Sequence, residues 1–302
     1  MDQQAIVVDS GNLLFKRLGA GSATPAEKIT AEAIASAYAE MGYDGVGIGP
    51  RDLTGGIDLL LKTRDLGVPW LSANMYDKSG NRIFEPYRLV DRGQLRFAVT
   101  AVTFAEQKSD DYTIGDAVQE LGSFLPELDT QADIIILLST LPLQQTAQLL
   151  QQASQIDIAV TADRSRGKVM PYHAGNAIIV QTGTRGQYAG ALDFMWRGQP
   201  WMNNRSTETA ALKRRLRSVS MQLKQVKNLP PEPRAEKTEM LQQQHENISA
   251  QIQELETAAA REISGDLSRY RCNFIPLSPS IRSDPAIDEI VESAKKLIRQ
   301  NK

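Results

Sequence analysis

The stretch that decides the fold is Asp133-Ile134-Ile135-Ile136-Leu137-Leu138-Ser139-Thr140-Leu141-Pro142. Its apolar run predicts a strand that is buried on both faces. The Leu- and Gln-rich segment Leu143–Ser154 predicts a helix, and Ile156–Val160 predicts a second buried strand. Strand, helix and strand in this order make a β-α-β unit, with polar residues gathered just past the strand ends. In open α/β sheets, binding and catalytic sites form at that edge.

The polar loop after the second strand is Thr161–Gly167, and it is the first candidate site segment. Beyond it, Asn176–Gln181 and Ala191–Phe194 predict two further strands. The segment Gly183–Gly190 has spaced glycines, but it lies between two strands and not ahead of a helix. It therefore predicts a turn and not a dinucleotide-binding loop.

The part of the chain before residue 133 also alternates strands and helices. Ala5–Asp9 predicts a buried strand, and Thr24–Glu27 has the capping-box spacing and early proline of a helix start. That helix runs to Met41, and Asp44–Ile48 predicts the next strand. The other predictions are a helix at Ile57–Leu66, a short strand at Trp70–Ala73, antiparallel strands at Tyr87–Val90 and Leu95–Thr103, and a helix at Ala117–Leu128. Together these elements predict a mixed α/β layered domain.

Five blocks of this domain follow one another in the order Val8–Asn12, Gly42–Asp52, Ile134–Leu141, Ile156–Ser165 and Ile178–Asp193. In these blocks the chain resembles the 5′-nucleotidase branch of the calcineurin-like metallophosphoesterases. The resemblance implies a layered α-β-β-α fold with mixed sheets over residues 1–203. Members of the family have an earlier strand with an Asp-x-His metal motif. No such motif lies ahead of the first predicted strand, so we expect that the strand was trimmed or lost.

The family's two-metal chemistry needs several His and Asp ligands together with an Asn. This chain has two histidines, His173 and His245, and His245 lies outside the nucleotidase-like part. The resemblance places the family's metal-ligand positions at Asn12, Pro50, Arg51, Thr140, Asp163 and Ser165. Because Asn and Thr oxygens bind divalent transition ions poorly beside His and carboxylate, we expect no dinuclear centre, no bound metal and no cofactor. The expected protein is a catalytically degenerate member of the family.

Basic residues replace some of the lost ligands. Guanidinium groups around the vacated pocket predict a phosphate or carboxylate clamp for a small anion or a nucleotide. The alternative is that these groups pair with Asp9, Asp52 and Asp163 and only fill the space. The anion-binding candidates are Arg51, Arg164, Arg166 and Arg185.

A rival hypothesis keeps catalysis, with one metal ion and a divergent hydrolase mechanism. Its candidate residues are Asp163, Asp52 and His173. His173 follows Pro171-Tyr172, which is also the setting of a hydrogen-bonded loop residue. Metal-dependent turnover of a phosphoester would separate this hypothesis from the degenerate one.

Residues 204–264 have a different character. Apolar residues in the first half are spaced 4-3-4-3, and a similar stripe occurs in the second half, as in the seam of a coiled coil. The first half is basic, the second half is rich in Glu, and Pro230-Pro231-Glu232-Pro233 separates them. This pattern predicts an antiparallel helical hairpin. Its seam residues are Leu212, Leu216, Val219, Leu223 and Val226, then Leu241, His245, Ile248, Ile252, Leu255 and Ala259.

An exposed two-helix arm presents surfaces to a protein partner or to a second copy, so we expect binding or assembly through residues 205–262. Residues 265–302 predict a returning strand at Tyr270–Leu277 and a last helix from Ser283 to Ile298. Leu277–Ile281 and this helix resemble regions that lead into multihaem modules in some exported relatives. A third hypothesis is therefore an accessory to an exported electron-transfer protein, although the chain has no Cys-x-x-Cys-His of its own.

Composition limits the partners. The 34 basic and 36 acidic residues nearly cancel, which argues against nucleic acid as a partner. The single cysteine, Cys272, excludes an internal disulfide. No apolar run approaches the roughly 18 residues of a membrane span. The start of the chain lacks the features of a signal peptide. The resemblance nevertheless implies a periplasmic or extracellular protein in a mature or trimmed form.

Overall fold

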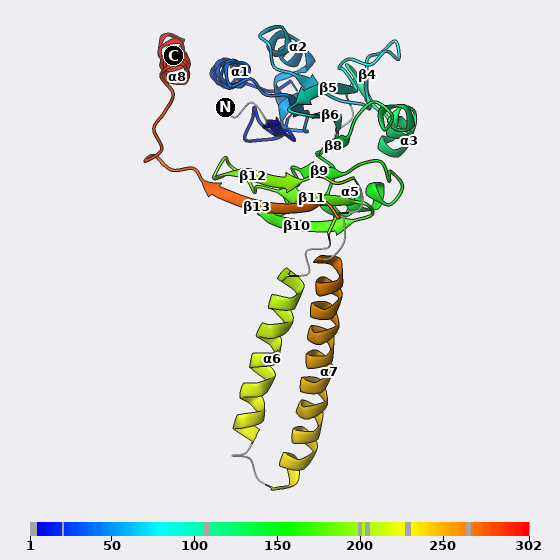
Figure 1. Cartoon of the computed structure of the whole chain (residues 1–302). Coiled ribbons are helices and arrows are strands. Elements are labelled where there is room, and N and C mark those ends of the chain that lie inside the picture. The colour runs from blue at the N-terminus through cyan, green and yellow to red at the C-terminus, as the bar shows by residue number, and fades with distance from the viewer. Residues whose placement is uncertain are drawn as a thin grey trace. The chain divides into compact units, whose positions relative to one another are not determined.

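The computed structural model describes residues 5–19, 21–105, 109–198, 201–202, 206–226, 231–263 and 267–301. The side chains at 206–208, 210–211, 231–233, 236, 255 and 258–263 are also left out of the description. The chain divides into two compact units, Met1–Asp193 with Arg271–Lys302 and Phe194–Tyr270 (Figure 1). We call them the body and the hairpin unit and describe each by itself.

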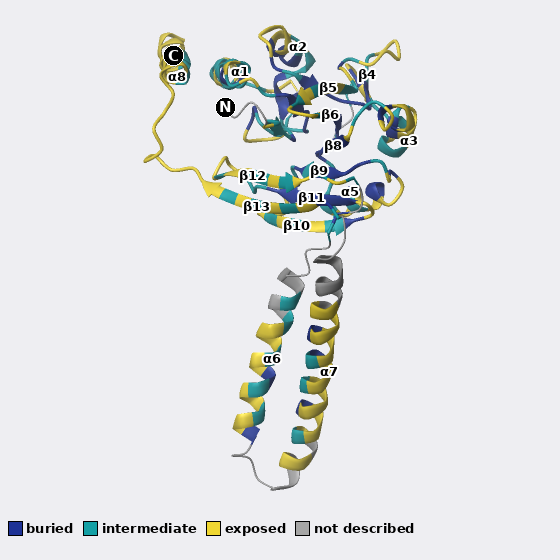
Figure 2. Ribbon diagram, viewed as in Figure 1, coloured by how far each residue is buried: buried dark blue, intermediate teal, exposed yellow. Residues whose placement is uncertain are grey.

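The core of the body is a six-stranded sheet in the order β10-β11-β9-β8-β6-β5. Its strands are β5 (Tyr87–Arg92), β6 (Leu95–Val102), β8 (Ile134–Ser139), β9 (Ile158–Thr161), β10 (Val169–Ala174) and β11 (Ala177–Gln181). β6, β8, β9 and β11 are mutually parallel, and the edge strands β5 and β10 are antiparallel to their neighbours. All six residues of β8 are buried, which confirms the strand predicted from the apolar run (Figure 2).

A second sheet of three parallel strands packs on the first. It contains β1 (Val8–Asp9), β2 (Gly45–Gly47) and β3 (Trp70–Leu71) in that order. Glycine lets the two sheets come close, because a Cβ added at Gly45 would lie 2.7 Å from Cγ1 of Val99 on β6. The two sheets form the central layers of the body.

Helices cover the outer face of each sheet. α1 (Pro25–Glu40), the 3-10 turn η1 (Asp52–Gly55) and α2 (Ile57–Asp65) share one hydrophobic core with β2 and β3. α3 (Ala117–Gly122), α4 (Leu125–Leu128) and α5 (Leu143–Leu150) share another core with the six-stranded sheet. The body is therefore the predicted α-β-β-α fold with mixed sheets. Thr24 caps α1 through the predicted capping box with Glu27.

The other elements of the body are short pairs and a last helix. β4 (Met75–Tyr76) pairs with β7 (Thr113–Ile114), and β12 (Tyr188–Met195) pairs with β13 (Arg269–Pro276). β12 and β13 each continue by two residues into the hairpin unit. The predicted last helix is α8 (Pro285–Gln300), which packs on α1 and is capped by Asp284.

The hairpin unit contains α6 (Ser206–Val226) and α7 (Pro231–Ile263). The predicted seam is present where side chains are described, since Val219, Val226, Leu241, Ile248 and Ile252 are buried and Leu212, Leu216 and Leu223 pack against them. Leu255 and Ala259, also predicted for the seam, lie outside the described side chains. Trp201 is buried against the rings of Phe194, Trp196 and Tyr270 within this unit.

Three predictions about local structure were wrong. Ala5–Asp9 is not a buried strand, because only Val8–Asp9 is strand and both residues are half-buried. Ala117–Leu128 is not one helix, because Phe124 leaves the helical region at φ −134° and Pro126 lies in the first turn of α4. His173 lies in strand β10 and not in a loop. Pro171 obscures β10 in the sequence, and proline is tolerated there because β10 is an edge strand. Among the described residues, no helix is both long and apolar enough to cross a lipid bilayer.

Candidate functional site

The candidate site lies where the carboxyl ends of strands from both sheets meet. The Ser10 hydroxyl, after β1, donates to the Val160 carbonyl of β9 at 2.8 Å. The Asn12 side-chain amide donates to the Ala162 carbonyl at 3.2 Å. The Thr140 hydroxyl, after β8, is 3.3 Å from the Ile48 carbonyl that follows β2. The fold therefore brings the predicted positions Asn12 and Thr140 to one edge, beside the loop that begins at Ala162.

Glycines make this close approach possible. Gly11 has φ +103°, and a Cβ on it would lie 2.6 Å from the Gly47 carbonyl oxygen. A Cβ on Gly49 would lie 2.6 Å from the Asn12 side chain. Asn12 itself has φ +63°, a left-handed conformation that asparagine tolerates better than most residues. The backbone of the site is therefore packed too tightly at these glycines for any side chain.

Asp52 accepts more hydrogen bonds than the other site side chains described below. It is 0% exposed, and its carboxylate accepts four backbone N–H groups. Oδ1 accepts from Leu13 at 2.7 Å and Leu14 at 2.8 Å, whereas Oδ2 accepts from Asn12 at 2.7 Å and Gly49 at 2.8 Å. Burial raises the pKa of Asp52 to about 6, and these backbone donors oppose that rise. Asp52 organises two loops through its hydrogen bonds.

Asn12 and Thr140 are also bonded to the backbone. Asn12 Oδ1 accepts the Arg51 N–H at 3.2 Å, in addition to the bond that its amide donates. Thr140 Oγ1 accepts the Phe104 N–H at 2.9 Å. Pro50 precedes Arg51 and has no N–H to offer. The oxygen atoms at these positions therefore stabilise loops.

Asp163 caps its own loop and the start of α5. Its Oδ2 accepts the Leu143 N–H at 2.8 Å, and its Oδ1 accepts the N–H and hydroxyl of Ser165 at 2.8 and 2.7 Å. Burial raises the pKa of Asp163, but the bonds from Leu143 and Ser165 outweigh burial and hold it below its usual value. Ser165, the other predicted ligand position of this loop, is a donor to Asp163.

Gln181, at the end of β11, is a site residue that the sequence did not reveal. It is 1% exposed. Its Oε1 accepts the Asp163 N–H at 2.8 Å, and its Nε2 donates to the carbonyls of Asp163 and Gly167 at 3.0 and 2.8 Å. One buried amide thus holds the whole loop 163–167 in place. A lone Gln after an apolar strand was the only signal in the sequence.

The charges of two predicted anion-binding arginines, Arg51 and Arg185, act on a third, Arg164. Burial lowers the pKa of Arg164, and the positive charges of Arg51 and Arg185 lower it further, while Asp52 raises it. Nη1 of Arg51 is shielded from solvent and has no hydrogen-bond partner among the described residues. Within the described part of the chain, these three guanidinium groups form no ion pair with Asp9, Asp52 or Asp163. We call Arg51, Arg164 and Arg185 the arginine cluster.

Asp9 has other partners. One of its oxygens accepts the Gly11 N–H at 2.8 Å, and the other accepts the Tyr38 hydroxyl at 2.8 Å. Burial raises the pKa of Asp9, and the bonds from Gly11 and Tyr38 lower it again. The alternative in which Asp9 neutralises a nearby arginine therefore receives no support from its contacts.

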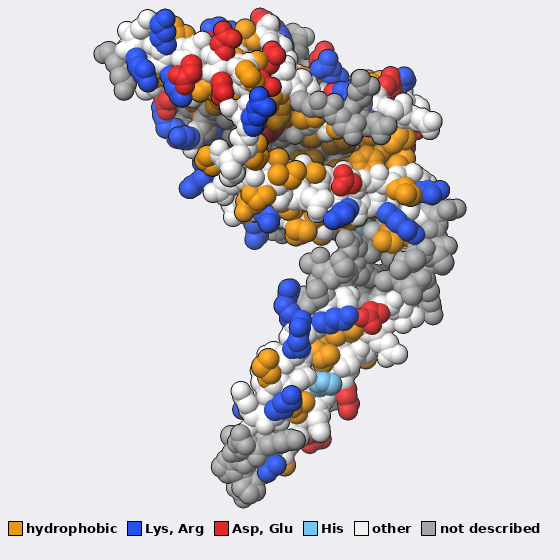
Figure 3. Space-filling view, turned by 60° about the vertical axis from the view of Figure 1, so that its left-hand side comes forward, with side chains coloured by type: hydrophobic (Ala, Val, Ile, Leu, Met, Phe, Trp, Pro, Cys, Tyr) orange, Lys and Arg blue, Asp and Glu red, His pale blue; other side chains and the backbone are white. Residues whose placement is uncertain are grey.

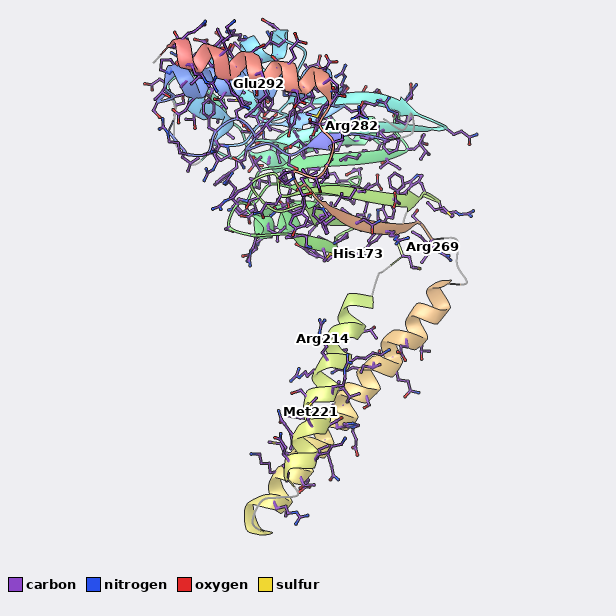
Figure 4. The ribbon with its side chains drawn as sticks, turned by 90° about the vertical axis from the view of Figure 1, so that its left-hand side faces the viewer. His173, Arg214, Met221, Arg269, Arg282 and Glu292 are labelled. Carbon is purple, nitrogen blue, oxygen red and sulfur yellow. The ribbon has the colours of Figure 1, made fainter. Side chains whose placement is uncertain are left out.

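Of the remaining candidates, Arg166 lies in the loop 163–167 and His173 lies away from the site. Arg166 influences Asp163 and Tyr172 of β10. His173, labelled in Figure 4, is paired with Ile178 near the start of β11, whereas the loop 163–167 is bonded to Gln181 at the end of β11. The amino group of Lys168 lies 4.9 Å from the Tyr188 ring centroid and 5.1 Å from that of Phe274. His173 is therefore separated from Asp163 by the length of β11.

The residues present do not fit a dinuclear metal centre. Among the described residues, no group of three or more His, Cys, Asp and Glu side chains is arranged to hold a metal ion. The two carboxylates nearest the family's ligand positions, Asp52 and Asp163, already accept four and three hydrogen bonds. A divalent ion would have to displace those donors and would find no imidazole beside them.

Sequence comparison supports the resemblance over a short region. A 5′-nucleotidase of Vibrio cholerae serotype O1 is 36% identical over 66 residues, which are 21% of this chain and 12% of that enzyme. A 5′-nucleotidase of Vibrio parahaemolyticus matches to the same extent. The match therefore spans far less than two thirds of these relatives. No protein-family model matches the chain.

Comparison of structures shows a shared fold. The sulfate thiohydrolase SoxB of Thermus thermophilus superposes with a TM-score of 0.56 at 20% identity, over 64% of this chain and 36% of that one. The NAD nucleotidase of Haemophilus influenzae gives a TM-score of 0.52 at 17% identity, over 62% of this chain and 37% of that one. The chain is therefore similar in sequence to 5′-nucleotidases over 66 residues and shares its fold with SoxB and the NAD nucleotidase.

Proposed function

We propose that the body is a nucleotidase-like domain that binds and assembles instead of hydrolysing phosphoesters through two metals. The observation that carries this proposal is the state of Asp52, whose two oxygens accept four backbone N–H groups in a fully buried position. A carboxylate engaged in this way is a structural cap for two loops. The same holds for Asp163 at the start of α5.

The arginine cluster supplies the binding part of the proposal. An unpaired, shielded guanidinium nitrogen on Arg51 beside two further positive charges favours an anion, because it would satisfy the donor and relieve the repulsion. A phosphate or a nucleotide phosphate has the acceptor geometry that guanidinium groups prefer. The arginine cluster would then bind the phosphate-bearing class of ligand that the family hydrolyses, and the protein would not hydrolyse it.

Titration calorimetry with inorganic phosphate and AMP tests the anion site. Each charge-assisted hydrogen bond is worth about 1.5–3 kcal/mol, so Arg51→Ala should weaken binding by roughly tenfold or more. Arg88→Ala, an exposed arginine on β5, is the matched control and should bind as the parent does. No heat and no thermal shift with millimolar phosphate or AMP would remove the anion site.

A divergent hydrolase is the second candidate, favoured by the 36% identity to 5′-nucleotidases over 66 residues. It would use Asp163 and Asp52, with His173, and a single metal ion. The protein should be incubated with Mn²⁺ or Zn²⁺ and p-nitrophenyl phosphate, with metal content measured in parallel. Turnover that disappears in Asp163→Ala would overturn the non-hydrolytic proposal.

The hairpin unit supplies the assembly part. Its outer surface is exposed (Figure 2) and carries charged side chains (Figure 3), while its seam is filled by apolar side chains. Further partners would therefore meet polar faces. We propose residues 204–264 as the docking element for a protein. An exported, periplasmic or extracellular location and a link to electron-transfer proteins are hypotheses that rest only on the family resemblance.

A further inference from the structure

One face of the hairpin is organised by charge. In α6, the residues that directly follow seam positions are Lys213, Arg217, Ser220 and Lys224. In α7, the residues that directly follow the seam positions Leu241, His245, Ile248 and Ile252 are Gln242, Glu246, Ser249 and Gln253. Glu256 lies seven residues, or one heptad, after Ser249 and is on the same side of α7. We call this the striped face, because one edge has only basic charges and the other only acidic ones.

The two rows lie on the same side of the hairpin. In an antiparallel pair of right-handed helices, residues one position after the seam project to one common face. The ion pair between Lys213 Nζ and Glu256 Oε1, at 2.7 Å, joins the two rows directly. Basic and acidic side chains lie along the hairpin surface in Figure 3. The opposite edge of α6, by contrast, has Arg215, Ser218 and Gln222.

The same ion pair fixes the heights of the other residues. Both helices rise about 1.5 Å per residue, so equal steps away from Lys213 and Glu256 stay level. Ser220 is seven residues after Lys213 in α6, and Ser249 is seven residues before Glu256 in α7, so the two serines lie at the same height. Their hydroxyls donate to their own helices, to Leu216 and His245, each at 2.8 Å. The middle of the striped face therefore carries only short serine side chains, and their hydroxyl groups are already hydrogen-bonded.

The outer charges of the striped face remain available. Arg217, Lys224 and Glu246 are exposed. Within the described residues, none of the three has an ion-pair partner. By the same register, Lys224 is level with His245, next to Glu246. A partner that carried acid opposite α6 and base opposite α7 at these heights would complement the face along its length.

We propose that a second copy of this chain is that partner, bound through the striped face about a two-fold axis parallel to the helices. This axis places α6 of one copy against α7 of the other at equal height, so the basic row of α6 faces the row of α7 that carries Glu246 and Glu256. A two-fold axis across the helices would place α6 against α6, which opposes like charges. The serines in the middle let the helices approach as a four-helix bundle. The inference rests on the proposed docking role of the hairpin.

Charge-reversed variants of the full chain test the face. Arg217→Glu with Lys224→Glu makes the striped face acidic, and Glu246→Arg with Gln253→Arg makes it basic. Each double variant alone should sediment as a monomer, and an equimolar mixture should form a heterodimer. Arg214→Glu with Arg215→Glu, two exposed residues of the same helix that do not follow a seam position, should dimerise as the parent does. Circular dichroism checks that all variants keep their helices.

Salt dependence and cross-linking complete the test. The dimer should weaken between 0.1 M and 1 M salt, as the Debye length falls from about 10 Å to about 3 Å. In a Cys272→Ser background, mixing Ser220→Cys with Ser249→Cys should give a disulfide-linked heterodimer on oxidation. A Ser220→Cys homodimer instead would show the crossed arrangement and overturn the inference.

Two other outcomes also overturn the inference. One is a parent protein that stays monomeric at low salt, and the other is a dimer that survives both reversals. Phosphate binding by the arginine cluster is measured on the same samples and does not depend on the hairpin. If the protein is monomeric and binds phosphate, the dimer proposal is wrong and the anion site is supported. If the protein dimerises and does not bind phosphate, the dimer proposal is supported and the anion site is wrong.

Discussion

At the scale of single residues, Asp52 shows how a position that resembles a catalytic one can be structural. Its four hydrogen bonds join the loop after β1 to the loop after β2, and no water reaches them. A buried acceptor used this completely is worth more to stability than a single surface ion pair. The site edge of the body is therefore held together by Asp52, a residue that the sequence made a candidate for catalysis.

Replacing Asp52 by Asn should destabilise the body. The amide nitrogen would face two backbone N–H donors and leave them unsatisfied, which costs about 1–3 kcal/mol for each group. We expect the free energy of unfolding in urea to fall by about 2–4 kcal/mol. Asp65→Asn, on the exposed end of α2, should change it by less than about 0.5 kcal/mol. Equal effects of the two substitutions would show that the cap is unimportant.

The capping box of α1 gives a pH-dependent contribution with a definite sign. The hydrogen bonds from Arg17 and then Thr24 lower the pKa of Glu27 from 4.5 to about 2. A carboxyl whose folded pKa is lowered stabilises the fold above its unfolded pKa and loses this effect as the pH falls through its folded pKa. The stability advantage of the parent over Glu27→Gln should therefore shrink between pH 4.5 and about 2.

Melting temperatures of the two proteins over this range measure the effect. Arg17→Gln serves as the second arm, because it removes the guanidinium group that donates to Glu27 and leaves the Glu27 carboxyl group in place. It should show a smaller pH-dependent advantage than the parent. A constant difference between the parent and Glu27→Gln at every pH would contradict the role of the charged carboxylate.

At the scale of elements, the sequence predicted the helices and strands whose apolar residues follow a regular pattern because they are buried. The run at β8 and the 4-3-4-3 stripe of α6 are examples, since in both the apolar residues are the buried ones. β10 was missed because Pro171 and exposed Met170 and Tyr172 hide an edge strand. The break between α3 and α4 depends on one proline within a helical pattern. A single helix-breaking residue or an exposed edge strand is a weaker signal in a sequence than a long run of buried apolar residues.

The site could be predicted only in outline. The family resemblance indicated that Asn12, Thr140 and Asp163 follow neighbouring strands, and the sheet topology does bring their loops together. The bonds that use up these side chains depend on turn geometry, such as φ +63° at Asn12, which a sequence does not display. The role of Gln181 depends on a loop that precedes it by more than a dozen residues. Tertiary hydrogen bonds of this kind carry no local pattern.

The meeting of the two sheets makes a prediction for Gly47 of β2. A Cβ at this position would lie 2.5 Å from the Ser10 carbonyl oxygen and 3.4 Å from the Leu138 side chain. Gly47→Ala should therefore push β1 away from β2, lower the melting temperature of the body and weaken phosphate binding by the arginine cluster. Gly122→Ala, at the end of α3 with open space around it, should be neutral or stabilising by about 0.4–1 kcal/mol. Normal stability in Gly47→Ala would show that the strands have room to spare.

At the scale of the whole molecule, the chain has separate hydrophobic cores in its two units. The cores of the body contain Leu60 and Ile135, whereas the core of the hairpin unit contains Ile248 and the other seam residues. Units with their own cores can unfold in separate transitions. The tryptophans are distributed in a useful way, because Trp70 lies in the body and Trp196 and Trp201 lie in the hairpin unit.

Separate unfolding can be followed in a Trp70→Phe background, where fluorescence reports only the hairpin unit. Ile248→Ala removes a buried seam side chain and should lower the free energy of the fluorescence transition by about 2–4 kcal/mol. Leu60→Ala creates a comparable cavity in the body and should leave the fluorescence transition unchanged while it lowers the transition seen by circular dichroism. A shift of the fluorescence transition in Leu60→Ala as large as in Ile248→Ala would mean that the units unfold as one. That result would also change the design of hairpin variants, since a reversal on α6 would then have to be corrected for its effect on the body.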